Sequence, residues 1–413
     1  MLRTKAARAG DDAGTLRVLL LSPVYPPARG GIETLSGEIA RNLAADVRVV
    51  ALAPDEQAPP STTFEPGRNG ATRVVRLRNR PRAGRRAIAV LNARAVAEGL
   101  RRRPDVILVM HVKASPAARI LSLLWRVPQV QYVHAKEMLE TPDLASFAVQ
   151  RASAVVCVSG YSRDLAIAAA ADPERCTIIP NGVGPASGQQ VDRAETPTLV
   201  TVSRLEDRYK GHDVVIRAMP AIVSAVAGVR WVIVGDGTLR PELERAVRDA
   251  GLTVQVEFAG AVPDEERDRL LGRAWVFVMP TRVPPGGAGE GFGIVYLEAN
   301  AHGLPVVAGE VPGVVDAVLH GRTGLLVDST DPDAVAAAVV RLLEDRELAA
   351  TLGAGGRRRA QELAWPNVVE DLELQLRDVA AQRFRRCGVA RATRGWSWLG
   401  DLLRAPQPSG PSR

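Results

Sequence analysis

The sequence predicts an α/β protein with two parallel-sheet domains that face each other across a cleft. Short apolar segments typical of buried strands alternate with helical segments in two successive series. A small, polar segment at 184–197, typical of a linker, separates the two series. The length of 413 residues accommodates two or three domains with cores of their own. We therefore expect an N-terminal domain over 16–190 and a C-terminal domain over 191–365.

The composition is that of a water-soluble globular protein, with 46% hydrophobic and 24% charged residues. No apolar run approaches the roughly 20 residues that a membrane-spanning helix needs. Residues 1–15 lack the apolar stretch of a signal peptide and are predicted to be disordered. The three cysteines, Cys157, Cys176 and Cys387, are widely spaced, which predicts neither a disulfide framework nor a metal site. These features favour a cytoplasmic protein.

The positive charge comes almost wholly from arginine. The formal net charge is +7, and most of the 53 basic residues are arginine rather than lysine. Together with the many alanines, this ratio indicates the codon bias of a GC-rich genome rather than a surface selected for nucleic acid. No nucleic-acid partner is therefore expected. The few lysines stand out, because Lys113, Lys136 and Lys210 lie in or beside predicted cleft loops.

A first strand–loop–helix unit opens the N-terminal domain. Leu16–Ser22 is an apolar strand, Pro23–Gly31 is a loop, and Ile32–Ala44 has the pattern of a helix. The unit lacks the Gly-x-Gly-x-x-Gly fingerprint, which disfavours a nucleotide-linked dehydrogenase. Gly30 and Gly31 leave room for a ligand close to the backbone, although a simple turn would look the same.

One of the next strands ends at a histidine. His134 directly follows the strand Val130–Val133, at the carboxyl edge where open α/β sheets bind ligands. A lone histidine is more often structural, so its position is the only argument for function at this point. Asn181-Gly182 predicts a sharp turn that closes the domain. The other strands of this domain are predicted at Val47–Leu52, Val74–Leu77, Val106–Val109 and Ala154–Ser159.

The segment from Arg73 to Arg103 is strongly basic, with Glu98 as its single acid. Two interpretations stay open. The arginines are either a solvated face produced by codon bias, on a helix over 86–103 whose apolar stripe faces the core, or a patch for anionic lipid headgroups. The tail over 385–413, which carries tryptophans among arginines, raises the same question.

The second series begins with the strand Thr198–Val202, which leads into a loop with two cations. Arg204 and Lys210 lie on either side of this loop, just before a predicted helix, in a position suited to a pair of phosphates. A solvated run of charges is the alternative. Further strands are predicted at Val232–Gly237, Val254–Ala259, Trp275–Pro280, Leu304–Ala308 and Gly324–Val327, and helices at Leu239–Ala250, Asp264–Arg273 and, as one helical region, Asp331–Leu363.

The whole chain is organised around the stretch Arg282–Ala308. A Pro/Gly loop leads to Glu290-Gly291-Phe292-Gly293, and a helix follows from about residue 294 to 302. A glycine turn entering a helix leaves backbone N–H groups unpaired beside the positive end of the helix dipole, which favours phosphate. Glu290 and Glu298 lie two turns apart, so both can face one cleft and accept hydrogen bonds from hydroxyl groups. This combination suits a nucleotide sugar, whereas two solvated glutamates on an ordinary loop–helix unit are the alternative.

The run E-G-F-G-(x)4-E-A, followed by G-L-P-V-V, resembles the Glu-x7-Glu motif of the retaining glycosyltransferases of family 4. The resemblance covers residues 16–380 and looks closest to the phosphatidylinositol mannosyltransferase-like branch. It implies the GT-B fold, in which two Rossmann-like domains face each other and a C-terminal helix, here 366–384, crosses back to the first domain. The implied catalytic residues are His134, Arg204, Lys210 and Glu290, and the implied donor-binding residues are Gly30, Gly31, Arg204, Lys210, Val262, Glu290, Gly291, Phe292, Gly293, Ile294 and Glu298.

By this resemblance the protein moves a hexose-type sugar from a GDP- or UDP-sugar to an acceptor hydroxyl with retention of configuration. The expected acceptor is a lipid-linked or cell-envelope glycan reached at the inner face of a membrane, or alternatively a soluble small molecule or natural product. A non-catalytic binding protein is a third alternative, which the intact set of Arg204, Lys210, Glu290 and Glu298 disfavours. No cofactor is expected. No Asp-x-Asp motif ends a predicted strand, so no divalent metal is expected either, and Arg204, Lys210 and the 291–294 backbone would neutralise the leaving diphosphate.

Overall fold

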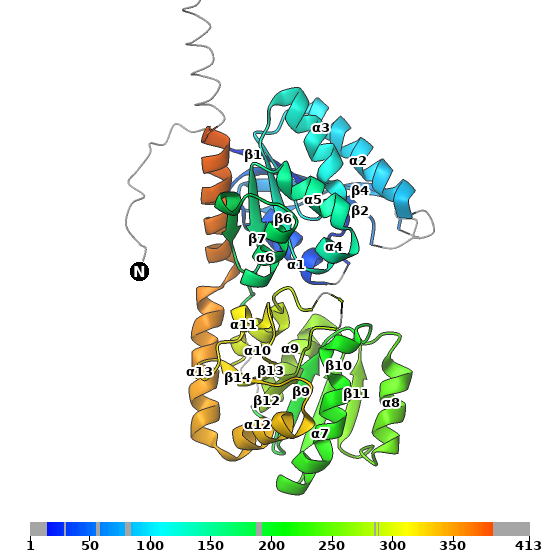
Figure 1. Ribbon diagram of the computed structural model, residues 1–413, viewed down its shortest axis with the longest axis vertical. Helices are drawn as coiled ribbons and strands as arrows, with labels where there is room; N and C mark the ends of the chain where they lie inside the picture. The colour runs from blue at the N-terminus through cyan, green and yellow to red at the C-terminus, as the bar shows by residue number, and fades with distance from the viewer. Residues whose placement is uncertain are drawn as a thin grey trace, which may run out of the picture.

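The computed structural model describes residues 15–28, 30–54, 58–78, 84–186, 192–284, 286–287 and 289–382. Two α/β domains lie one above the other, and a long helical segment runs along one side of both (Figure 1). Each domain has its own sheet, and the predicted tails over 1–14 and 385–413 lie outside the described residues.

The first sheet has the strand order β3-β4-β2-β1-β5-β6-β7-β8. All neighbouring pairs are parallel except β3 and β4. The central strands are continuous apolar runs because helices cover both faces of the sheet. The strands are β1 (Arg17–Leu21), β2 (Asp46–Leu52), β3 (Ser61–Gly67), β4 (Gly70–Leu77), β5 (Val106–Val109), β6 (Gln129–Val133), β7 (Ala154–Cys157) and β8 (Cys176–Ile178). The helices are α1 (Gly31–Asn42), α2 (Gly84–Arg101), α3 (Ser115–Trp125), α4 (Lys136–Glu140), α5 (Pro142–Gln150) and α6 (Gly160–Ala168), with 3-10 turns η2 (Val112–Ala114) and η3 (Pro173–Arg175).

The antiparallel strand β3 is absent from the sequence-based prediction. It pairs with β4 through a tight turn that ends at Gly70, whose φ is +108°. Pro66 lies within β3, and proline removes a donor from the ladder, so the sequence argues against a strand there. The strand tolerates Pro66 because it forms the edge of the sheet.

The second sheet is entirely parallel, with the order β11-β10-β9-β12-β13-β14. Trp231 and Phe277 are among its fully buried side chains. The strands are β9 (Thr198–Val202), β10 (Arg230–Val234), β11 (Val256–Gly260), β12 (Val276–Met279), β13 (Val306–Gly309) and β14 (Gly324–Val327). The helices are α7 (His212–Ala225), α8 (Arg240–Asp249), α9 (Asp264–Arg273), α10 (Ile294–Ala301), α11 (Val314–Ala317), α12 (Pro332–Glu344) and α13 (Arg346–Glu362), with the 3-10 turn η4 (Arg208–Lys210).

The helical region predicted as one piece over Asp331–Leu363 is two helices. The chain breaks at Asp345, which leaves helical geometry (φ −92°, ψ 90°) and begins α13. Its carboxylate accepts a hydrogen bond from the backbone N of Leu348 at 2.9 Å, as a helix N-cap does.

The C-terminal helix over 365–382 crosses back to the first domain, as the GT-B resemblance predicts (Figure 1). Glu373 accepts a hydrogen bond from the backbone N of Ala44 at 3.1 Å. Gln375 donates to Thr177 of β8 at 3.1 Å. These contacts join the C-terminal helix to the connection between α1 and β2 and to β8.

The segment around Asn181-Gly182 is extended, so the predicted sharp turn is wrong. Val183 forms a parallel bridge with Ala364, and its backbone N donates to Leu363 O at 2.9 Å. A Cβ built at Gly182 would lie 2.4 Å from the Trp365 ring, so only glycine fits between the two crossing segments. The two connections between the domains therefore run side by side.

Much of the basic segment 73–103 is engaged within the protein. Glu98 is 1% exposed and contacts Arg73, Arg94 and Arg101. Burial opposes its charge, but the three guanidinium groups outweigh burial and lower the pKa of Glu98. Others of these arginines contact further partners: Arg76 contacts Glu65, Arg102 contacts Asp46, and Arg103 lies over the Trp125 ring.

Across the described residues, no helix is both long and apolar enough to cross a membrane.

Candidate active site

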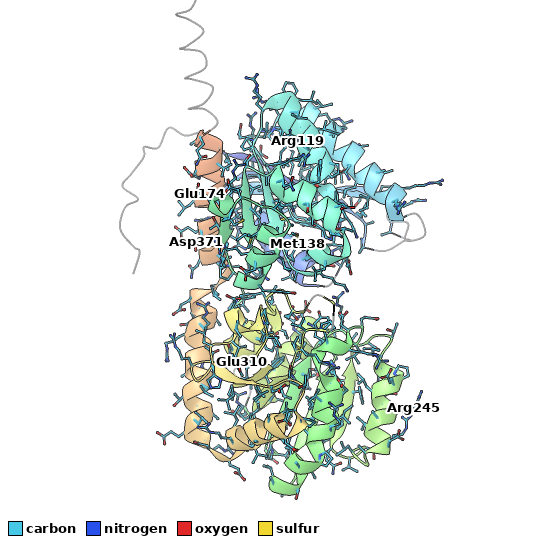
Figure 2. The ribbon with its side chains drawn as sticks, viewed as in Figure 1. Arg119, Met138, Glu174, Arg245, Glu310 and Asp371 are labelled. Carbon is cyan, nitrogen blue, oxygen red and sulfur yellow. The ribbon has the colours of Figure 1, made fainter. Side chains whose placement is uncertain are left out.

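The carboxyl edges of the two sheets face each other across the boundary between the domains, and the predicted site residues gather there. A Cβ built at Gly291 would lie 3.6 Å from the backbone N of Ala135, next to His134. A Cβ built at Gly31 would lie 3.9 Å from Ile294 Cδ1. The first turns of α1 and α10 therefore meet across the boundary, and Figure 2 places Met138 of α4 close to the same boundary.

The turn Glu290–Gly293, which we name the donor loop, is held by close backbone packing. Gly293 precedes α10 with φ +89°, a conformation that favours glycine. Gly313 has φ +86°, and a Cβ there would lie 2.1 Å from Glu290 O. Below the loop, the buried Tyr296 hydroxyl donates to Met279 O at 2.9 Å. The turn before α11 and the strand β12 thus fix the loop from two sides.

The donor loop presents unpaired backbone donors. The N–H groups of Gly291, Gly293 and Ile294 donate no hydrogen bond to any residue that the structure describes. They lie at the N-terminus of α10, where the helix dipole is positive. This arrangement suits an anionic oxygen of a phosphate or sugar phosphate.

Lys210 reaches the donor loop from the second domain's first loop. Gly211 has φ +84°, and a Cβ there would lie 2.2 Å from Pro280 O, so glycine allows the start of α7 to approach β12. The Lys210 ammonium donates to Glu290 Oε2, and the two side chains are only 14% and 16% exposed. Burial of the ammonium opposes its charge, but Glu290 outweighs burial and raises the pKa of Lys210. Lys210 is therefore a cation at neutral pH.

Arg204 lies in the same loop but remains exposed. It forms no ion pair with any described residue. The loop around it is fixed, because Leu205 N donates to Asp236 O at 2.9 Å and a Cβ at Gly235 would overlap Ser203 O. The structure therefore joins Lys210 to Glu290 and leaves Arg204 as a free cation on a rigid loop.

His134 is 8% exposed, and hydrogen bonds at its backbone N and at its ring fix its orientation. Its backbone N donates to Glu137 Oε1 at 2.7 Å, and its Nε2 lies 3.0 Å from Met110 O. A carbonyl oxygen can only accept, so Nε2 donates this hydrogen bond. The neighbouring His111 is half-buried, and burial, with Lys113 and His134 adding, lowers its pKa to about 3.

Glu298 is partly buried on α10. Its carboxylate lies 4.0 Å from Arg267, and its side chain is 26% exposed. Burial raises the pKa of Glu298; Arg267 opposes the rise, and Asp268 and Asp264 add to it. Val262, one of the predicted donor-binding residues, lies two residues after the end of β11 and packs partly against the core.

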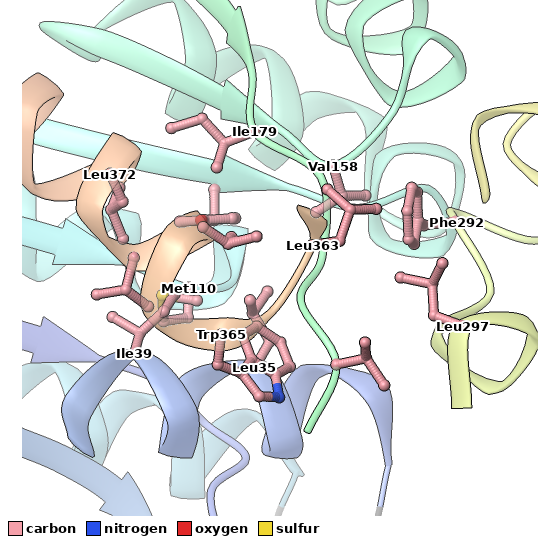
Figure 3. Packing of buried hydrophobic residues seen from close by; sticks show 14 of the residues in the cluster. Leu35, Ile39, Met110, Val158, Ile179, Phe292, Leu297, Leu363, Trp365 and Leu372 are labelled. Atoms are coloured by element: carbon pink, nitrogen blue, oxygen red, sulfur yellow. The ribbon is translucent and has the colours of Figure 1, made fainter. Parts of the chain in front are cut away.

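Phe292, one of the predicted donor-binding residues, has a buried side chain. It is 1% exposed and belongs to the apolar cluster that spans both domains. Figure 3 shows it in one group with Val158 and Leu363. Phe292 therefore contributes only its backbone to the exposed side of the donor loop, because its ring fills the interior.

Two contacts across the boundary were missed by the sequence-based prediction. Lys136 Nζ lies 3.6 Å from Asp207 Oδ1, and the backbone N of Gly160 donates to Asp316 Oδ2 at 3.2 Å. The scarcity of lysine singles out Lys136, but nothing local to the sequence indicates its partner. Asp316 lies in a short helix with no sequence signal of its own.

Two family models match the two domains. The model described as "Glycosyltransferase Family 4" matches residues 29–187, and the one described as "Glycosyl transferases group 1" matches residues 196–345. Together these matches include the donor loop and the strands of both sheets except β1.

Curated relatives cover most of the chain. A GDP-mannose-dependent alpha-(1-6)-phosphatidylinositol monomannoside mannosyltransferase of Mycobacterium tuberculosis is 31% identical over 83% of this chain and 92% of its own length. A D-inositol 3-phosphate glycosyltransferase of Acidothermus cellulolyticus is 30% identical over 92% of this chain and 94% of its own length.

Solved structures share the fold. HepE of Anabaena, crystallised in complex with UDP, has a TM-score of 0.70 and 22% identity, covering 88% of this chain and 100% of its own. Sucrose-phosphate synthase of Thermosynechococcus elongatus has a TM-score of 0.74 and 22% identity, covering 89% of this chain and 100% of its own. These matches show the family, and the two facing α/β domains agree with its fold. The chain belongs to the family 4 glycosyltransferases of the GT-B fold.

Proposed function

We propose that this glycosyltransferase moves a mannose-type hexose from GDP-mannose to a hydroxyl of a phosphoinositol-type or other lipid-linked acceptor, with retention of configuration. The observation that carries the proposal is the buried Lys210–Glu290 pair beside the unpaired amides of the donor loop. A cation, a carboxylate and free N–H groups are the partners that a sugar diphosphate requires.

The roles of the residues follow from their charges. Lys210, Arg204 and the amides of 291–294 bind the diphosphate and stabilise the charge that develops on it as the glycosidic bond breaks. Glu290 accepts hydrogen bonds from sugar hydroxyls, and Glu298 accepts them from the ribose. His134, oriented by Met110 O, contacts the sugar from the other domain.

We favour attack from the same face as the leaving group, because no carboxylate is an obvious nucleophile. The acceptor oxygen bonds to the anomeric carbon as the bond to the phosphate oxygen breaks. The leaving phosphate takes the hydroxyl proton.

We favour guanine as the base that binds beside the loop after β11. Asp264 follows Val262 by two residues at the start of α9, and its side chain is 72% exposed. A carboxylate there can accept from the N1–H and 2-amino groups of guanine, whereas uracil offers it the single N3–H donor. The GDP-mannose dependence of the mycobacterial relative supports the same choice.

For the acceptor, two candidates have support. The mannosyltransferase relative acts on a phosphatidylinositol monomannoside, and the other relative acts on D-inositol 3-phosphate. Both names contain a phosphorylated inositol. The first acceptor belongs to a membrane and the second is soluble.

For a membrane acceptor we propose attachment through Arg78, Arg85 and Arg86, at the inner face of the membrane. All three are exposed, and they lie between the end of β4 and the first turn of α2. That is the same carboxyl edge of the sheet that holds His134. Arg119 of α3, by contrast, lies at the far end of the domain (Figure 2).

A donor panel tests the proposal. GDP-mannose, GDP-glucose, UDP-glucose and UDP-N-acetylglucosamine are compared by the rise in melting temperature, since a ligand that binds the native state stabilises it. We expect GDP and GDP-mannose to give the largest rise, and the rise to shrink in Lys210→Ala. Transfer from the selected donor is then measured with inositol 3-phosphate and with phosphatidylinositol in vesicles. A larger rise with UDP-sugars would overturn the choice of base, and no rise with any donor would overturn the function.

A further inference from the structure

The first residue of α6, which follows β7, donates a hydrogen bond to a residue of the C-terminal domain. Within α6, Ser159 and Ser162 form a reciprocal capping box: the Ser159 hydroxyl accepts from Ser162 N and the Ser162 hydroxyl accepts from Ser159 N, both at 3.0 Å. The first helical N–H, that of Gly160, is left over. It donates to Asp316 Oδ2 at 3.2 Å, from α11 of the C-terminal domain.

Asp316 is linked to the donor loop through the backbone of its own turn. Gly313, three residues earlier, packs so closely under the loop that a Cβ would lie 2.1 Å from Glu290 O and 3.1 Å from Gly291 O. Val318 N donates to Val314 O at 2.8 Å, which keeps this short helix compact. A shift of Asp316 would therefore move the support of Glu290.

The donor loop also packs against the turn before α6, through the side chain of Phe292. The ring lies in one apolar cluster with Val158, the residue directly before Ser159, and with Leu363 of the crossing segment (Figure 3). Two contacts therefore link the C-terminal domain to the start of α6. Asp316 provides a polar contact, and Phe292 of the donor loop provides an apolar one.

We propose that Asp316 is a positioning residue for glycosyl transfer: by capping α6 of the opposite domain, it holds the turn under Glu290 and so sets the geometry of the donor loop against the acceptor-side domain. The inference rests on the proposed function, since the geometry matters for transfer between the domains. It adds Asp316, a residue outside the donor site, as the link between the domain contact and that site.

The test compares three variants of the full-length protein. Asp316→Ala removes the acceptor for Gly160 N, whereas Asp316→Asn keeps an oxygen that can accept. Asp331→Ala is the matched control, because Asp331 caps α12 within the C-terminal domain by accepting from Asp333 N at 2.9 Å. All three are measured for kcat, KM for the donor, affinity for the nucleoside diphosphate, and hydrogen exchange of the 158–165 segment.

We expect Asp316→Ala to lower kcat about 10- to 100-fold, the range seen when a remote change misplaces reacting groups, with diphosphate affinity within about threefold of the parent. Exchange of the 158–165 amides should rise. Asp316→Asn should recover most of the rate, and Asp331→Ala should lose thermal stability while keeping kcat. Equal kcat in the Asp316→Ala and Asp331→Ala proteins, or unchanged exchange at 158–165, would overturn the role. The exchange readout needs no turnover, so it separates failure of this inference from failure of the proposed function.

Discussion

The Lys210 ammonium donates to the Glu290 carboxylate, joining the first loop of the C-terminal domain to the donor loop across 80 positions of sequence. Both side chains are mostly buried, so the interaction is weakly screened by solvent. In the proposed reaction, the diphosphate must share Lys210 with Glu290. The cation and the carboxylate are therefore competitors as well as partners.

This competition predicts an unusual phenotype for Glu290→Gln. The change keeps the size of the side chain and removes the charge that holds Lys210. We expect affinity for free nucleoside diphosphate to rise about 3- to 10-fold, equivalent to roughly 0.7–1.4 kcal/mol, while kcat falls because a sugar contact is weakened. Titration calorimetry with GDP and steady-state kinetics measure the two effects. Weaker GDP binding in the variant would mean that Glu290 supports the diphosphate rather than competing for Lys210.

Loss of Lys210 and loss of Arg204 should have different effects on the stability of the fold. Lys210→Ala and Arg204→Ala should each lower kcat by about 10²–10³, the usual loss when one preorganised charge contact is removed. Only Lys210→Ala should also lower the melting temperature, because it leaves the buried Glu290 without its partner. Arg204 is exposed and unpaired among the described residues, so its removal should leave stability unchanged. Near-normal turnover in both proteins would remove the pair from the mechanism.

The strands and the helices around the donor loop were predictable because their signals are local. Apolar runs such as that of β9 and the acidic start of α9 appear at the predicted places. The donor loop was predictable for a related reason: glycines at a strand–helix junction mark close backbone approach. Here Gly293 and Gly313 are both required by their positive φ.

What the sequence could not indicate are contacts between distant segments. The Gly160–Asp316 hydrogen bond joins residues 156 positions apart, and neither has a distinctive neighbour. In the same way, a count of arginines cannot reveal that Glu98 contacts Arg73, Arg94 and Arg101. The motif names Phe292 as donor-binding, but it does not indicate that packing between the domains buries the ring.

Glu298 is expected to lower the stability of the fold as pH rises, while it contributes to donor binding. Burial raises the pKa of Glu298, so the folded protein binds this proton more tightly than the unfolded chain does. The contribution to stability is then full below the unfolded pKa and is lost as pH rises through the folded pKa. Glu298→Gln should therefore raise the melting temperature at about pH 8, and the gain should shrink towards about pH 4.

The same variant should bind the donor less well if Glu298 contacts the ribose. We expect about a tenfold loss of nucleoside diphosphate affinity with kcat less affected, the reverse of the Glu290→Gln pattern. Thermal melts across pH and GDP titrations provide the measurements. A gain in stability without loss of affinity would assign Glu298 to the fold alone.

Membrane attachment can be tested at the exposed arginines of α2. Electrostatic attraction to an anionic surface is worth about 1 kcal/mol per arginine in contact and falls with salt. The full-length protein should sediment with phosphatidylglycerol vesicles at about 50 mM salt and much less at about 500 mM, and not with phosphatidylcholine vesicles. The double change Arg85→Glu and Arg86→Glu should weaken sedimentation strongly.

The matched control is Arg245→Glu with Arg248→Glu, the same change of charge on exposed positions of α8 in the other domain (Figure 2). If only the α2 variant loses vesicle binding, the contact lies at the edge of the sheet that carries His134, where a lipid-linked acceptor would reach the donor loop. If both variants lose it equally, net charge alone drives the binding. If the parent protein stays in the supernatant at low salt, the arginines reflect codon bias, and a soluble acceptor such as an inositol phosphate becomes the better candidate.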